Sequence, residues 1–181
     1  MKGFVRDNQL LSLCGLNCGL CSMKLGGHCS GCGNGNQSCK IARCSLEHGG
    51  VSYCFQCPEY PCDQYLHIDD YDSFITHQNQ KANLERAKAI GMNRYNEEQR
   101  ERVRILNLLL AHYNDGRRKT FFCLAANLLP LSALQTAVSQ LQGSEDLDLK
   151  ERSAQAVRLL QSSANAHGIL LKLRKKPRSG S

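Results

Sequence analysis

Ten of the eleven cysteines lie between residues 14 and 62, and their spacing is that of metal ligands. Three pairs have two intervening residues: Cys18/Cys21, Cys29/Cys32 and Cys54/Cys57. Two thiolates at that spacing fit one turn of backbone around a single ion. The other cysteines of the segment are Cys14, Cys39, Cys44 and Cys62. The sequence therefore predicts a metal-binding segment.

Zinc is the ion that this pattern favours. A tetrahedral zinc site takes four ligands, so the ten cysteines fill two sites and leave two thiols over. The working partition gives one ion to Cys18, Cys21, Cys29 and Cys32. It gives the other ion to Cys39, Cys44, Cys54 and Cys57. Cys14 and Cys62 can replace members of either set, and interleaved pairings fit the spacing equally well. His28 and His48 lie beside cysteines, but the surplus of thiols favours their being exposed loop residues.

An iron–sulfur cluster is the competing interpretation. Four thiolates also hold a four-iron cluster, and Cys14, Cys18 and Cys21 have the spacing that radical-SAM enzymes use. Those enzymes need a large barrel, and the residues after Cys62 show no repeated strands. The closely spaced cysteine run followed by Pro that is typical of ferredoxins is also missing.

A disulfide framework is disfavoured because the cytoplasm, where we expect this protein, keeps thiols reduced. The odd number of cysteines also argues against complete pairing. Residues 1–13 contain no apolar signal segment, and no later run approaches the length of a membrane span. We therefore expect a cytoplasmic protein with reduced thiols and no membrane contact.

Cys123 stands apart from the other cysteines, within an apolar run. It is either a small buried core residue, which we favour, or a reactive thiol whose pKa is lowered by a basic helix entry. That entry consists of Arg117, Arg118 and Lys119, which form either an anion site or a solvated surface. No catalytic triad, phosphate-binding glycine loop or His-Glu-x-x-His motif is present, so no catalytic residue is assigned.

The sequence predicts a mainly α protein of two parts and a tail. Residues 1–66 are rich in Gly, Ser and Asn, and we expect loops, turns and short strands without a hydrophobic core, folded by bound metal. Residues 67–176 have a helical period that predicts a bundle of four to five helices, and residues 177–181 form a disordered tail. The expected helices cover about 77–90, 93–113, 120–129, 132–142 and 147–167, with Gly91, Pro130, Gly143 and Gly168 as stop signals. Residues 169–174 alternate and predict one short edge strand.

The charge is uneven. The formal net charge is +7, yet residues 1–70 contain only five basic against six acidic side chains. The basic second half has two explanations: it binds nucleic acid, or it docks on a front half made more negative by zinc–thiolate sites. Nucleic-acid binding ranks last because aromatic side chains are not interleaved with the basic ones.

Several motifs resemble a prokaryotic cysteine-rich family, a domain of unknown function presumed to bind zinc. The opening Cys14-Gly15-Leu16-x-Cys18-x-x-Cys21 and the closing Cys57-x-Glu59-Tyr60-Pro61-Cys62 are similar to that family. So are the segments at residues 113–119, 121–125, 128–131 and 168–175. The resemblance implies a zinc-binding module joined to a helical half, and it implies no activity.

The sequence thus predicts a cytoplasmic zinc protein with a structural or partner-binding role. The partner is an unidentified protein or small molecule. The alternatives are an iron–sulfur or thiol-based redox protein and, third, a nucleic-acid-binding protein.

Overall fold

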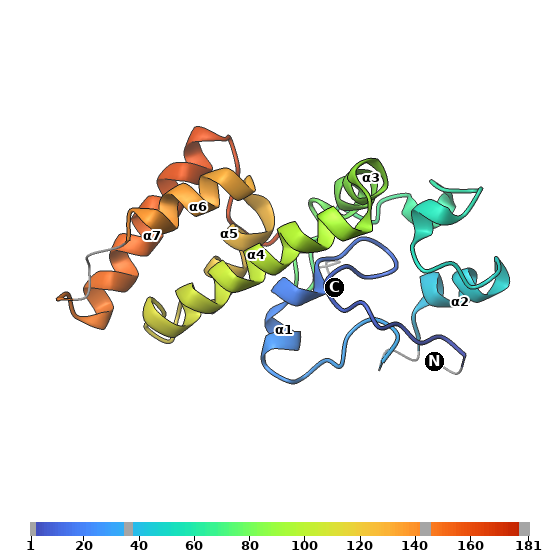
Figure 1. The fold of residues 1–181 in the computed structure, drawn as a ribbon, viewed down its shortest axis with the longest axis horizontal. Helices are drawn as coiled ribbons and strands as arrows, with labels where there is room; N and C mark the ends of the chain where they lie inside the picture. Colours follow the sequence, from blue (N-terminus) through green and yellow to red (C-terminus); the bar gives the residue numbers. More distant parts are fainter. Residues whose placement is uncertain (1–2, 35–37, 142–145, 178–181) are drawn as a thin grey trace. The chain divides into compact units, whose positions relative to one another are not determined.

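A computed structural model describes residues 3–34, 38–141 and 146–177 (Figure 1). Over these ranges the chain forms seven α-helices and three short 3-10 helices, and no strand. The expected mainly α fold is therefore confirmed. In chain order the elements are η1 (Cys18–Leu20), α1 (Ser22–Leu25), α2 (Lys40–Glu47), η2 (Cys54–Gln56), η3 (Asp63–Tyr65), α3 (Gln80–Ile90), α4 (Met92–His112), α5 (Lys119–Leu128), α6 (Leu131–Ser139) and α7 (Leu149–Ala166).

The chain divides into two compact units. The first comprises Met1–Gln99 with Leu173–Ser181, and the second comprises Arg100–Lys172. The boundary expected after residue 66 thus lies inside the first unit. The reason is that α3 and the start of α4 share a core with the cysteine-rich segment: Leu84, Ala87 and Tyr95 are buried in the same cluster as Leu11 and Leu13.

The first unit has a hydrophobic core, so the expectation of a coreless front segment is wrong. The buried cluster contains Phe4, Leu11, Leu13, Ala42, Tyr53, Cys54, Tyr65, Leu84, Ala87 and Tyr95. The front segment supplies apolar residues too scattered to show a period, and helices from later in the chain complete their burial. Such a core is visible only after the two stretches have come together.

Polar contacts from α3 and α4 fix the loop that carries the first cysteines. The side chains of Gln80 and Asn83 donate to the carbonyls of Cys14 (3.1 Å) and Gly15 (2.9 Å). The Tyr95 hydroxyl donates to the buried Asn17 side chain (2.8 Å). Gly15 has φ +99°, and a Cβ there would lie 2.2 Å from the Gln80 carbonyl oxygen. The close approach of this loop to α3 therefore requires glycine.

The second unit contains the apolar helices that the sequence predicts. Every side chain of α5 from Phe122 to Leu128 is buried, and Leu129 in extended conformation ends the helix before Pro130. Asp148 caps α7 and accepts a hydrogen bond from the Glu151 amide (2.8 Å). The helix α6 begins at Leu131, one residue before the expected cap at Ser132. The stop signal Gly143 lies outside the described residues.

The predicted edge strand at residues 169–174 is wrong. These residues run without regular structure, because no second strand among the described residues offers them a ladder. Arg174 instead exchanges two hydrogen bonds with Asp72, through its amide and through its carbonyl (both 2.7 Å). Over the ranges that the structure describes, no helix is both long enough and apolar enough to cross a membrane.

Candidate metal centre

All eleven cysteines are free thiols. Ten of them line two separate cavities of the first unit. This arrangement differs from a disulfide framework, in which the sulfurs would be bonded pair by pair. It leaves a set of soft donors of the kind that zinc and iron–sulfur clusters prefer.

The larger site, the six-thiol cavity, has a volume of about 400 Å³. Six cysteines line it: Cys14, Cys18, Cys21, Cys29, Cys32 and Cys39. Cys18 and Cys21 are held by the single turn of η1, where the Cys21 amide donates to the Cys18 carbonyl (3.2 Å). The rest of the wall is largely apolar and includes Phe4, Leu16, Met23, Phe74 and Ile75.

Backbone amides already donate to two of these sulfurs, and a hydroxyl contacts a third. The Gly31 amide donates to the Cys29 sulfur (3.4 Å) and the Leu13 amide donates to the Cys32 sulfur (3.5 Å). The Ser12 hydroxyl is in hydrogen-bond contact with Cys14, with 3.2 Å between Oγ and Sγ. Such donors orient thiolate ligands and stabilise their negative charge in metal sites.

The smaller site, the four-thiol pocket, has a volume of about 20 Å³. Its four cysteines are Cys44, Cys54, Cys57 and Cys62. Cys54 and Cys57 stand at either end of the η2 turn, where the Cys57 amide donates to the Cys54 carbonyl (3.0 Å). The rings of Tyr60 and Tyr65 also line the pocket and meet edge to face, with centroids 4.9 Å apart.

The division into six and four differs from the working partition. Cys39 and Cys44 were expected in one site, but α2 separates them: Cys39 precedes the helix as its N-cap and Cys44 lies in its second half. A helix rises about 1.5 Å per residue, so the two thiols enter different cavities. Cys14 joins the larger set and Cys62 completes the smaller one. The spacing of the cysteines does not reveal that a helix lies between Cys39 and Cys44.

Burial disfavours the thiolate form of Cys18 and of Cys54 when no cation is present. It raises the pKa of Cys18 to about 12, with further increases from Cys32 and Cys14. Burial likewise raises the pKa of Cys54 to about 12. Among the described residues, no three His, Cys, Asp or Glu side chains form a group that could hold a metal ion as they stand. Neutral thiols have nothing to draw them together, whereas an ion would deprotonate them and supply that attraction.

Arg6 is a buried cation near the six-thiol cavity that the sequence did not single out: it packs against Gly33, which lines the cavity. Its side chain is only 7% exposed, and its guanidinium stacks on the Tyr53 ring at 4.5 Å from the centroid. One nitrogen, Nη2, donates to the Leu11 carbonyl (3.0 Å), while the buried Nε and Nη1 have no partner. Burial raises the pKa of Cys32 overall, and the positive charge of Arg6 opposes part of that increase. No spacing rule in the sequence connects residue 6 to the cysteines.

The two histidines beside the cysteines differ: His48 lines the four-thiol pocket with its Nδ1 3.7 Å from the Cys44 sulfur, whereas His28 lines neither thiol cavity. His28 is exposed. His48 follows α2, where its Nδ1 donates to the Cys44 carbonyl (2.8 Å) and its Nε2 lies 3.3 Å from a Glu59 carboxylate oxygen. The bond to the Cys44 carbonyl, followed by the charge of Glu59, raises the pKa of His48. Both ring nitrogens therefore have partners of their own.

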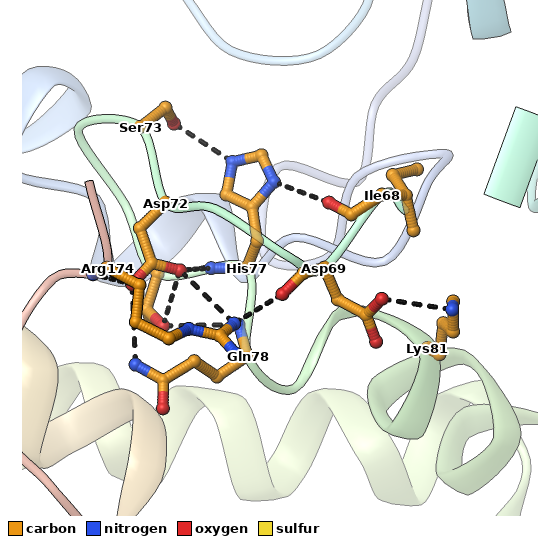
Figure 2. A network of polar contacts seen from close by, with 9 residues as sticks. Ile68, Asp69, Asp72, Ser73, His77, Gln78, Lys81 and Arg174 are labelled. Carbon is orange, nitrogen blue, oxygen red and sulfur yellow. Dashed lines mark hydrogen bonds and ion pairs between the residues drawn. The ribbon is translucent and has the colours of Figure 1, made fainter. Parts of the chain in front are cut away.

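Residues 71–77 form a strap that covers part of the six-thiol cavity through Phe74 and Ile75. Asp72 holds the strap in place (Figure 2), and its carboxylate is fully buried. It accepts hydrogen bonds from the amides of His77 and Arg174, both at 2.7 Å. Burial alone would raise the pKa of Asp72, but these donors outweigh it and the pKa is lowered. The Arg174 guanidinium also contacts the Asp69 carbonyl. Arg174 therefore holds both the strap and Asp69, which precedes it.

The remaining candidate residues lie in the second unit. Cys123 is buried, at 7% exposure, on the fully packed face of α5. Arg117, Arg118 and Lys119 lie at the start of that helix, and the Arg118 side chain is 3.6 Å from the Asp115 carboxylate. The burial of Cys123 is that of a core side chain. Nothing in the described residues adds a ligand to the basic trio.

Comparison with known proteins found no matching family model, and no curated protein or solved structure matched the chain. The resemblance to a cysteine-rich prokaryotic family therefore stays a prediction. The two sets of thiols are the feature of the chain that bears on its function.

Proposed function

We propose that the chain is a cytoplasmic metal-binding protein that holds zinc in two thiol sites of its first unit. The observation that supports this most is the gathering of ten free thiols on two cavities. Thiols this close cost free energy if they ionise without a cation, so their clustering is explained by an ion that they share.

The donor set fits zinc. Four thiolates in a tetrahedron are a common structural zinc site, and the four-thiol pocket supplies four cysteines and no carboxylate. Its volume of about 20 Å³ suits an object no larger than one water molecule. In such a site the residues Cys44, Cys54, Cys57 and Cys62 would hold the ion, which would supply folding energy rather than a reactive water, because no coordination position is left open.

The role that follows is structural or partner-binding. The described loop residues 3–17, 26–34 and 38–39 contain no helix, and a bound ion would fix them against α3. The thiols themselves would serve as ligands. A reducing compartment is needed to keep ten thiols available, which favours the cytoplasm.

An iron–sulfur cluster is the second candidate, and one observation favours it. Cys14, Cys18 and Cys21, the cluster-type triplet of the sequence, lie together in the larger cavity with three further thiols. Its mostly apolar wall is also of the kind that surrounds iron–sulfur clusters.

Elemental analysis of the anaerobically purified full chain separates these functions. We expect a colourless protein with zinc in both thiol sites and no acid-labile sulfide. Equal amounts of iron and sulfide, together with absorption in the visible range, would show that the chain holds an iron–sulfur cluster instead of zinc. A protein that carries neither metal and binds none when titrated under reducing conditions would contradict metal binding altogether.

A further inference from the structure

We propose that the six-thiol cavity holds two zinc ions bridged by shared cysteine thiolates, with Arg6 as the buried counter-charge. This inference rests on the proposed zinc function and makes it specific: the chain would bind three zinc ions, two in the cavity and one in the four-thiol pocket.

The number of thiols is the first argument. One tetrahedral ion uses four sulfurs and would leave two of the six without a role. A four-iron cluster would leave two as well. Two tetrahedral ions need four sulfurs each, and six thiolates meet that need when two of them bridge both ions. Only the two-ion centre employs every thiol that lines the cavity.

The size of the cavity is the second argument. The four-thiol pocket measures about 20 Å³, which matches a single ion, and the six-thiol cavity measures about 400 Å³. Its thiols also come from separate pieces of backbone: the loop at Cys14, the η1 turn, the 29–32 loop and the N-cap of α2.

The charge of Arg6 is the third and independent argument. Two zinc ions and six thiolates leave a net charge of about −2. A buried guanidinium without an anion is costly, and no carboxylate within the described ranges pairs with Arg6, whose Nε and Nη1 are buried without partners. The backbone of Arg6 packs against the segment that follows Cys32, since a Cβ at Gly33 would lie 2.7 Å from the Arg6 amide nitrogen.

The first experiment counts and locates the metal in the zinc-loaded full chain. We expect three zinc ions per chain after dialysis under reducing conditions, and a zinc–zinc scattering path in X-ray absorption spectra. A count of two with no such path would overturn the bridged centre while leaving zinc binding intact. Iron with sulfide would also overturn it, and an absence of metal would reject the proposed function itself.

A second experiment asks whether all six thiols are ligands, and it needs no variant. Brief alkylation of the zinc-loaded protein, read by mass spectrometry, should leave all ten cysteines of the two sites unmodified, the exposed Cys29 included. A single-ion site would leave two thiols of the cavity free, and their selective modification would overturn the proposal. Cys62→Ser is the matched variant for the other site: it should lower the zinc count from three to two and keep the zinc–zinc path.

Arg6 is tested as a positioning residue. Arg6→Gln should weaken zinc binding in the cavity by about 10–100-fold, as is typical for partners of metal ligands, and leave the zinc of the four-thiol pocket unchanged. Arg6→Lys, which keeps the charge, should recover most of that affinity. Arg94→Gln, which removes an exposed cation of the same unit, is the control. Equal losses at both sites, or no recovery with Lys, would mean that Arg6 only supports the fold.

Discussion

The two units of the chain bury their side chains in different ways. In the second unit, α5 alone buries seven consecutive residues, Phe122 to Leu128. In the first unit, α3 buries three, Gln80, Leu84 and Ala87, and most other core residues come from loops and short turns. The second unit is thus held by apolar surface in regular helices. The first has a smaller core whose loops are fastened by hydrogen bonds and, in our proposal, by zinc.

The comparison shows how a loop-rich segment can have a core and still depend on metal. The buried cluster of the first unit includes Cys54 and anchors residues near the other cysteines, such as Leu13 and Tyr53, while the ten cysteines line the two cavities. In our proposal, apolar burial positions the backbone, and bound zinc joins the cysteines across each cavity. In the second unit most buried residues belong to the helices, and Leu129 and Leu141 are buried just beyond the ends of α5 and α6.

Zinc removal should produce the largest difference between the units. A structural zinc site contributes about 10–16 kcal/mol of apparent binding free energy to folding. We expect that a chelator under reducing conditions increases amide hydrogen exchange throughout residues 10–66 and leaves α5, α6 and α7 protected. Hydrogen exchange read by mass spectrometry measures both at once, and added zinc should restore protection. Unchanged exchange in residues 10–66 would show that the small core suffices without metal.

Matched deletions in the two cores should have similar sizes and different consequences. Leu84→Ala and Leu134→Ala each empty a fully buried site, at a cost of about 2–5 kcal/mol. Leu84 lies against the loop at Gly15, so its loss should weaken zinc retention. Leu134 is on α6 in the second unit, so its loss should lower thermal stability and leave zinc retention unchanged. Competition with a chromophoric chelator measures how tightly each variant retains zinc. Equal zinc retention by both variants would argue that the units are not independent.

The carboxylate of Asp72 should matter to the first unit alone. Asp72→Asn removes the charged acceptor of the strap and should cost about 1.5–3 kcal/mol, the range for hydrogen bonds to charged groups. Because donors lower the pKa of Asp72 in the folded state, its stabilisation is complete above the value of a free carboxyl, about 3.9. It is lost as the pH falls through the lowered folded value.

At neutral pH we therefore expect faster exchange of residues 70–78 in Asp72→Asn. The control is Asp70→Asn, which changes a more exposed carboxylate paired with His67 in the same loop. If both variants exchange alike, the strap is not held by Asp72.

Removal of the α7 cap is the smallest expected effect and belongs to the second unit. Asp148→Ala deletes the side chain that accepts from the Glu151 amide, and N-cap losses cost about 1 kcal/mol. Chemical denaturation followed by circular dichroism should show that decrease, with zinc content unchanged. A loss of zinc from this variant would contradict the separation of the units.

The sequence by itself determined the helices from α3 onward and singled out the ten clustered cysteines, but it did not predict α1 and α2. The 3.6-residue period located α3 to α7 closely, since apolar stripes, Pro130 and the Asp148 cap act over a few neighbouring residues. Cysteine spacing identified the ten thiols, because a two-residue gap is a local geometric requirement. Both signals are readable along the chain without knowledge of distant contacts.

Only the tertiary structure decided how these parts combine. The core of the first unit joins residues such as Leu13 and Leu84, which are far apart in the sequence, so no local period predicts it. The division of the thiols into six and four follows from where α2 separates Cys39 from Cys44. Arg6 lies near the six-thiol cavity because its loop packs against Gly33. Each of these depends on which surfaces meet in three dimensions, and burial, unlike helical period, is a property of the assembled chain.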